Sequence, residues 1–307
     1  MKKMQLGFMV LAMTSLAACS MEAPGSSSEE ESTNGGEAGG DYTIGFSVST
    51  LNNPFFVTLN EGAEAKAAEL GADLTVVDAQ DNASKQASDI EDLIQQEVDL
   101  IMINPVDSEA VAAAVESANA ASIPVITVDR SAAGGEVVSH IASDNIAGGE
   151  MAGEHLVSIV GEGAQVAELE GVPGSSAARE RGEGFNTIAA DSLDVVAKQT
   201  ANFNRAEGLS VMENILQANP DITGVFAHND EMALGALEAI EASGKDITVV
   251  GFDATDDAVQ AVEDGRLGGT IAQKPEMIGE MAVETAVQSL DGEEVEASIP
   301  VELELIQ

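Results

Sequence analysis

Short apolar runs alternate with helical patterns along the chain from Asp41 onward. The apolar runs are rich in Val and Ile and have the length of strands, whereas the segments between them repeat apolar residues with the period of a helix. Pro54 stands at an expected first helical position, and Gly71 ends the pattern that follows it. The first half of the chain predicts strands at 42–49, 74–77, 100–103 and 125–128, and helices at 54–70, 84–96 and 108–121.

A second series of the same kind begins near Asp144. Alternation of strands and helices of this length predicts parallel sheets with helices on both faces, and two series predict an α/β protein of two doubly wound lobes. Strands are predicted at 166–169, 195–198, 224–227, 248–252 and 270–272, and helices at 146–159, 176–190, 206–218, 231–242 and 256–263.

The first forty residues have a different composition. Lys2 and Lys3 precede an apolar stretch over 6–16 that is too short to span a bilayer, and small residues then lead to Cys19, the only cysteine. This pattern resembles the bacterial lipobox, which implies a lipoprotein signal peptide over 1–19 and lipidation of Cys19. Residues 20–40 are rich in Ser, Glu and Gly and predict an acidic flexible tether. We expect an exported protein that is anchored at the cell envelope by its lipid alone.

The charge of the chain is strongly negative, with 54 acidic residues against 12 basic ones and a net charge of −42. Such a field repels nucleic acid and anionic headgroups, so neither is expected as a general partner. We interpret the acidic surface as a halophilic adaptation, because concentrated salt screens the repulsion between carboxylates. An acidic surface without special purpose is the alternative.

Polar and aromatic residues follow many of the predicted strands. In open parallel sheets, ligands bind outside the carboxyl ends of the strands. Amides, carboxylates and guanidinium groups satisfy the paired donors and acceptors of sugar hydroxyls, and aromatic rings pack against the C–H faces of a sugar ring. The pattern therefore favours a polyol site. The strand ends lead to Asn53, Phe55, Phe56, Asn104, Asp129 and Arg130 in the first series, and to Phe203, Asn229, Asp253 and Gln273 in the second.

Six of these residues also have a purely structural explanation. Phe55 and Phe56 could belong to the core, and Asp129 and Arg130 could form a local ion pair. Asn104 and Asn229 could cap strand ends, as short polar side chains often do. What favours the sugar site is that the residues converge from many strand ends at once.

Other chemistry finds little support in the sequence. The histidines His140, His155 and His228 have no metal-ligand spacing, and the sole cysteine is assigned to the lipobox. The glycine pairs match neither a dinucleotide fingerprint nor a phosphate loop, and no serine lies in a nucleophile elbow. We therefore expect no enzyme, no cofactor and no metal.

Several runs resemble the bacterial ribose-binding proteins, and the resemblance extends over 41–307. His228 is a departure, since it stands where that family has a neutral amide. The runs are STLNNPFF (49–56), IPVITVDR (123–130), EVVSHIASDN (136–145), SAARERGEGF (176–185), NDEMALGAL (229–237), VVGFD (249–253) and TIAQ (270–273).

The resemblance implies a periplasmic-binding-protein type I fold with three hinge crossovers. It places an N-terminal lobe at 41–143 with 274–302 and a C-terminal lobe at 144–273 with 303–307. It also implies two sets of site residues. The hydroxyl-bonding positions are Asn53, Asp129, Arg130, Arg181, Asn229, Asp253 and Gln273, and the ring-packing positions are Phe55, Phe56 and Phe203.

By the same resemblance, we expect a monomeric substrate-binding lipoprotein that closes on D-ribose and delivers it to the permease of an ABC importer. Another small sugar or a furanone-like signal, with allose and galactose as examples, is the alternative ligand, and a chemoreceptor is a possible second partner. A repressor of the lac repressor family would share the fold. The lipobox and the acidic tether exclude it, because such a repressor begins with a DNA-binding domain.

Overall fold

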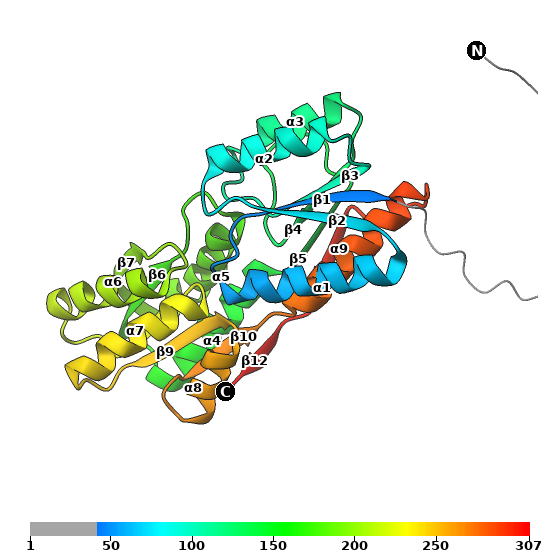
Figure 1. Cartoon of the computed structure of the whole chain (residues 1–307). Helices are drawn as coiled ribbons and strands as arrows, with labels where there is room; N and C mark the ends of the chain where they lie inside the picture. Colours follow the sequence, from blue (N-terminus) through cyan, green and yellow to red (C-terminus); the bar gives the residue numbers. More distant parts are fainter. Residues whose placement is uncertain (1–41) are drawn as a thin grey trace, which may run out of the picture. The chain divides into compact units, whose positions relative to one another are not determined.

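The computed structural model describes residues 42–307, so the predicted signal peptide, Cys19 and the tether lie outside the described residues. The chain builds two six-stranded sheets (Figure 1). The first sheet is parallel throughout and has the order β11-β5-β4-β3-β1-β2. Its strands are β1 (Thr43–Val48), β2 (Asp73–Asp78), β3 (Leu100–Ile103), β4 (Val125–Val128), β5 (Ser139–Ser143) and β11 (Ser298–Val301).

The second sheet has the order β12-β10-β9-β8-β6-β7. It is parallel except for β12, which pairs antiparallel with β10 at one edge. Its strands are β6 (Ala164–Glu170), β7 (Leu193–Thr200), β8 (Gly224–Ala227), β9 (Thr248–Asp253), β10 (Gly269–Ala272) and β12 (Glu304–Ile306).

Helices cover both faces of each sheet, which confirms the predicted pair of doubly wound α/β lobes. On the first sheet, α1 (Pro54–Leu70) and α9 (Pro275–Leu290) lie on one face, and α2 (Ala83–Gln95) and α3 (Ala112–Ala120) lie on the other. On the second sheet, α4 (Asn145–Val160) and α5 (Ser176–Ser192) lie opposite α6 (Arg205–Ala218), α7 (Asp230–Ser243) and α8 (Asp256–Glu263). We call these assemblies the first lobe and the second lobe.

Each lobe has one apolar core on either side of its sheet. Phe46 and Leu59 are fully buried between the first sheet and α1, and Leu93 fills the opposite face. In the second lobe, Phe185 and Phe226 stack with their ring centroids 4.7 Å apart. Strands that are buried on both faces explain the near-continuous apolar runs in the sequence.

The helices α1 and α9 lie in close backbone contact. A Cβ atom on Gly62 would collide with the carbonyl oxygen of Glu276, and one on Gly279 would collide with the carbonyl oxygen of Leu59. Glycine at these two positions lets the helices approach closely, although the helices are separated by most of the sequence.

The chain passes between the lobes three times. It crosses after β5, because α4 packs on the second sheet, and it returns after β10, because α9 packs on the first. It crosses again between β11 and β12. Across 42–307, no helix has both the length and the apolar character needed to cross a membrane.

The structure differs from the predicted elements in two ways, a later helix start and four elements that were not predicted. The helix predicted from residue 108 begins at Ala112, because the Asp107 carboxylate accepts the N–H groups of Glu109 and Ala110 and holds that segment in a turn. The strands β5, β11 and β12 and the helix α9 were absent from the predicted elements. The edge strand β11 contains Pro300, which cannot donate to a ladder and weakens the strand signal in the sequence.

Candidate sugar-binding site

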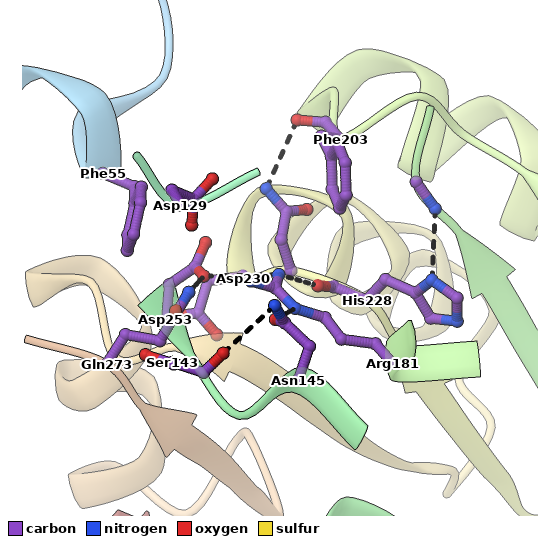
Figure 2. Close-up of polar contacts among 12 residues, drawn as sticks. Phe55, Asp129, Ser143, Asn145, Arg181, Phe203, His228, Asp230, Asp253 and Gln273 are labelled. Carbon is purple, nitrogen blue, oxygen red and sulfur yellow. Dashed lines mark hydrogen bonds and ion pairs between the residues drawn. The ribbon is translucent and has the colours of Figure 1, made fainter. Parts of the chain in front are cut away.

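The strand ends of the two sheets meet at a small cavity with about 230 Å³ of empty space that is partly open to solvent (Figure 2). Gln273 stands beside it and donates from Nε2 to Asp253 Oδ1 at 2.8 Å. The cavity is lined by nine of the ten predicted site residues, together with Ala177: Asn53, Phe55, Phe56, Asp129, Arg130, Arg181, Phe203, Asn229 and Asp253.

The start of α1 brings three of these residues to the cavity. The Asn53 side chain caps the helix by accepting the N–H of Phe55 at 3.0 Å. Phe55 and Phe56 meet edge to face with ring centroids 5.2 Å apart, and both belong to the core of the first lobe while also lining the cavity. These two rings therefore belong to both the core and the site.

The end of β4 supplies Asp129 and Arg130, which form an ion pair with 3.6 Å between Oδ2 and Nε. Asn104 donates from Nδ2 to Asp129 Oδ2 at 3.3 Å and to the carbonyl of Val128 at 3.0 Å. Its Oδ1 accepts the N–H of Ser49 at 3.1 Å. Asn104 does not line the cavity and so has the structural role that was the alternative in the sequence.

Arg181 reaches the cavity from α5 and is held by several groups. Its Nε donates to Asn145 Oδ1 at 2.8 Å, and its Nη1 donates to the carbonyl oxygen of His228 at 2.6 Å. Asp253 Oδ1 lies 3.6 Å from Nη1, and the guanidinium carbon lies 3.9 Å from the centre of the Phe252 ring. These contacts fix one orientation of the guanidinium plane before any ligand binds.

Three cavity residues have a positive φ although none of them is glycine. The values are 64° for Asp129, 58° for Phe203 and 121° for Asp253. Such conformations cost on the order of 1–3 kcal/mol each and occur mainly at functional sites, where the surrounding structure imposes them. Asn229 adds a further constraint, since it caps α7 through the N–H of Met232 and donates to the carbonyl of Phe203 at 3.4 Å.

The charges in the cavity are balanced. Two arginines face two aspartates, and the Arg130 guanidinium lies 5.0 Å from the ring centre of Phe56 and 5.3 Å from that of Phe203. Burial raises the pKa of Asp253 well above its ordinary value, although Arg181 acts in the opposite direction. A site without net charge but rich in donors and acceptors suits a neutral polar ligand.

Several polar atoms at the cavity make no hydrogen bond within residues 42–307. They are Asp129 Oδ1, Arg130 Nε and, beside the cavity, Gln273 Oε1. A buried polar group without a partner costs about 1–3 kcal/mol, so a ligand that carries hydroxyls and pairs with these atoms gains that free energy on binding.

The lobes also touch beside the cavity. The N–H of Ser108 in the first lobe donates to the carbonyl of Gly174 in the second at 2.9 Å. The N–H of Ser131 donates to Ser176 Oγ at 2.9 Å. A Cβ atom on Gly174 would collide with the Asp107 side chain, which would have to move to accommodate it. We call this set of contacts the latch.

Three residues that support the site were not among the predicted site residues. Asn145 follows β5, a strand that the pattern did not reveal, and His228 contributes its main chain. The buried Asp230 carboxylate accepts from the N–H of Thr255 at 2.7 Å and from the hydroxyl of Thr270 at 2.7 Å. Burial raises the pKa of Asp230 to about 7, although these bonds favour its charged form. Asp230 directly follows Asn229, which is the only signal that could have identified it.

Metal chemistry has no candidate ligand set within the described part of the chain, where no three His, Cys, Asp or Glu side chains gather around a common point. The site is therefore defined by hydrogen-bonding groups and aromatic rings.

Two α/β lobes that enclose a polar cavity at the ends of their sheets define the class of two-lobed solute-binding proteins. Residues 44–294 match the periplasmic binding protein domain, and the chain belongs to this family.

Similar proteins extend this result. The ribose import binding protein RbsB of Bacillus subtilis is 54% identical over 305 residues, which covers 99% of each chain. The Escherichia coli protein of the same name is 54% identical over 266 residues, or 86% of this chain and 90% of that one. Among solved structures, the Caulobacter myo-inositol binding protein bound to myo-inositol has a TM-score of 0.84 and 34% identity, covering 88% of this chain and 94% of that chain.

Proposed function

We propose that this protein is the D-ribose-binding component of an ABC sugar importer. The observation that carries the proposal is the 54% identity to two ribose import binding proteins, one of which aligns over 99% of its length. The cavity supports it independently, because balanced charges, unpartnered polar atoms and two phenylalanines at one wall suit a small neutral polyol. Because such a site binds hydroxyls without presenting an activated nucleophile, we infer binding without catalysis.

We propose that binding works by closure of the two lobes, with hinges near 143–144, 273–274 and 302–303. The first lobe contributes Asn53 and Arg130 to the cavity, and the second contributes Arg181 and Asn229. A sugar bonded to both lobes stabilises the closed arrangement by its differential affinity for it. The closed monomer then presents one fixed surface to the permease. Export and a lipid on Cys19 complete the proposal, since such an anchor keeps the protein beside the permease.

A calorimetric titration with a panel of sugars tests the ligand. We expect D-ribose to bind most tightly, and 2-deoxyribose to bind at least about tenfold more weakly, because loss of one hydroxyl leaves a buried partner unpaired. The panel includes D-allose, D-galactose and myo-inositol, since solved relatives hold D-allose and myo-inositol. Equal affinity for ribose and 2-deoxyribose, or tight binding of a hexose without binding of ribose, contradicts the proposal.

A further inference from the structure

A fully buried pair of ionisable side chains, Glu168 and His228, lies behind the cavity (Figure 2 shows His228). Glu168 is on β6, and His228 directly follows the neighbouring strand β8. His228 Nε2 lies 2.9 Å from Glu168 Oε1. On the other side of the ring, the N–H of Gly171 donates to Nδ1 at 3.4 Å. One imidazole therefore bridges a carboxylate on β6 and the backbone just beyond the end of that strand.

The two bonds determine which nitrogen carries the proton. Because Nδ1 accepts from Gly171, the proton of a neutral ring is on Nε2, which donates to Glu168. Burial lowers the pKa of His228 and Arg181 lowers it further, whereas Glu168 and Glu170 act in the opposite direction. A second proton would have to occupy Nδ1, where it would face the Gly171 N–H donor to donor. The bridge therefore requires the neutral imidazole.

The charge of Glu168 is satisfied from the other side. Asn186 donates to Oε2 at 3.1 Å, and Lys198 Nζ lies 3.3 Å from the same oxygen. Although burial opposes ionisation, the bond from His228 and the charge of Lys198 contribute to a net lowering of the pKa of Glu168. The carboxylate is thus a fixed acceptor, and the imidazole has no alternative partner of equal strength within the described residues around it.

The pair contacts the site at Arg181. The main-chain oxygen of His228 accepts from Arg181 Nη1 at 2.6 Å. Gly182, the next residue of α5, packs on the pair so closely that a Cβ there would lie 3.2 Å from His228 Cε1 and 3.3 Å from Glu168 Oε1. Both the guanidinium of Arg181 and the backbone beside it therefore depend on where this ring lies.

We propose that His228 is a positioning residue for Arg181. Its neutral ring, bridged between Glu168 and Gly171, fixes the main chain that follows β8, so that the carbonyl oxygen of His228 orients the guanidinium toward the sugar. This role rests on the proposed function, because it is measured through sugar binding. The role is also compatible with the neutral amide that the ribose-binding proteins have at this position. An amide side chain, like a neutral imidazole, can donate one hydrogen bond and accept another.

Two substitutions of His228 test the bridge by calorimetry with D-ribose at pH 7.5. His228→Gln can donate to Glu168 and accept from Gly171, so we expect affinity within about threefold of the wild type. His228→Leu can do neither, and we expect affinity to fall at least about tenfold, since both partners remain buried and unpaired. The matched control is His155→Leu. His155 is buried in the same lobe and bonds the carbonyl of Gly268 beside β10, and we expect its loss to lower the melting temperature without changing affinity.

A double variant separates positioning from general destabilisation. If His228 acts through Arg181, Arg181→Ala with His228→Leu binds no more weakly than Arg181→Ala alone, because the group being positioned is already gone. Rescue by His228→Gln keeps the proposal testable even if His228→Leu does not fold.

Additive losses in the double variant, unchanged affinity in His228→Leu, or a loss in His228→Gln as large as that in His228→Leu would overturn the positioning role. Failure of the wild type to bind ribose overturns the proposed function instead. In that case the same variants are titrated with the panel sugar that binds most tightly.

Discussion

Arg181 shows how one side chain in this protein is fixed by groups that are distant in sequence. It contacts Asn145 at the start of α4, the carbonyl that follows β8, and Asp253 at the end of β9. A charge-assisted bond to a ligand contributes about 1.5–3 kcal/mol only if the guanidinium is already oriented. Orientation before binding is therefore part of the affinity.

We predict that Arg181→Ala weakens ribose binding by about ten- to a hundredfold in calorimetry, since it removes a charge-assisted bond. Arg266→Ala is the matched control in the same lobe. Its exposed guanidinium pairs with Glu241 and does not line the cavity, so we expect nearly unchanged affinity. Equal losses in the two variants would remove Arg181 from the site.

The buried Asp230 makes stability depend on pH. Its pKa is about 7 in the folded protein and about 4 in an unfolded chain, so between these values the folded protein binds more protons. The contribution of Asp230 to the free energy of unfolding therefore falls as pH rises through this window.

We predict that Asp230→Asn removes this dependence. Relative to the wild type, the variant should gain up to about 1.4 kcal/mol per pH unit between roughly pH 4 and 7, and the difference should level off above pH 7. Urea unfolding at several pH values measures it. Asp256→Asn, an exposed neighbour on α8, should follow the wild-type profile. Parallel profiles for Asp230→Asn and the wild type would contradict the assignment.

Residues at the cavity were largely predictable, whereas the residues that hold them were not. Phe203 and Asp253 follow predicted strands, and parallel strands bring their ends to one edge, so proximity follows from order alone. The role of Glu168 or Asn145 depends on which strand or helix lies beside it, and that pairing leaves no local pattern. Arg181 lies inside α5, so only resemblance to a family indicated it.

Elements with caps in the sequence were predicted closely, and elements fixed by distant partners were not. The helix α1 runs from Pro54 to Leu70 as predicted, with Asn53 and Gly71 as its caps. The strands β5 and β11 pair with each other, as Ile141 with Ile299, and neither has the near-continuous apolar run of β3 or β4. Local signals mark where an element begins and ends, but a strand with few apolar residues becomes evident only through its neighbour.

The latch gives a prediction for the equilibrium between lobe arrangements. In Gly174→Ala, the new methyl collides with Asp107, whose carboxylate is held by the N–H groups of Glu109 and Ala110. The collision exists only while the lobes touch, and overpacking costs about 1–3 kcal/mol. We therefore predict affinity for ribose weaker by about five- to a hundredfold, with the melting temperature of the ligand-free protein unchanged.

Solution scattering separates this effect from damage to the site. Ribose should reduce the radius of gyration of the wild type, and at the same subsaturating concentration the reduction in Gly174→Ala should be smaller. Gly134→Ala is the control, since a Cβ there meets only side chains of its own lobe. Identical curves for the wild type with and without saturating ribose would rule out hinge closure.

The acidic surface acts on the molecule as a whole. Only 12 basic residues offset 54 acidic ones, which leaves a net charge of −42. Ion pairs such as Arg266 with Glu241 are exposed and contribute little to stability. Repulsion among carboxylates then favours the expanded, unfolded chain, and salt screens it over about 8–10 Å near physiological strength and less at molar levels.

We predict that the melting temperature rises from low to molar sodium chloride. Scanning calorimetry of the protein measures it, and sorbitol at equal osmolality is the control for effects that do not involve charge. A flat or falling melting temperature across the salt series would leave the composition without this explanation.

The close contact between α1 and α9 has a consequence for the timing of folding. A ribosome releases the chain from its N-terminus, so residues 54–70 emerge long before 275–290, the segment against which Gly62 packs. The first sheet likewise lacks its edge strand until 298–301 has been made. The first lobe, although it begins the chain, is thus completed only near the end of synthesis, whereas every helix of the second lobe lies in one uninterrupted stretch. For an exported protein, this order leaves the core beneath α1 incomplete until synthesis is nearly over. The nascent chain therefore cannot complete the packing of this core before then.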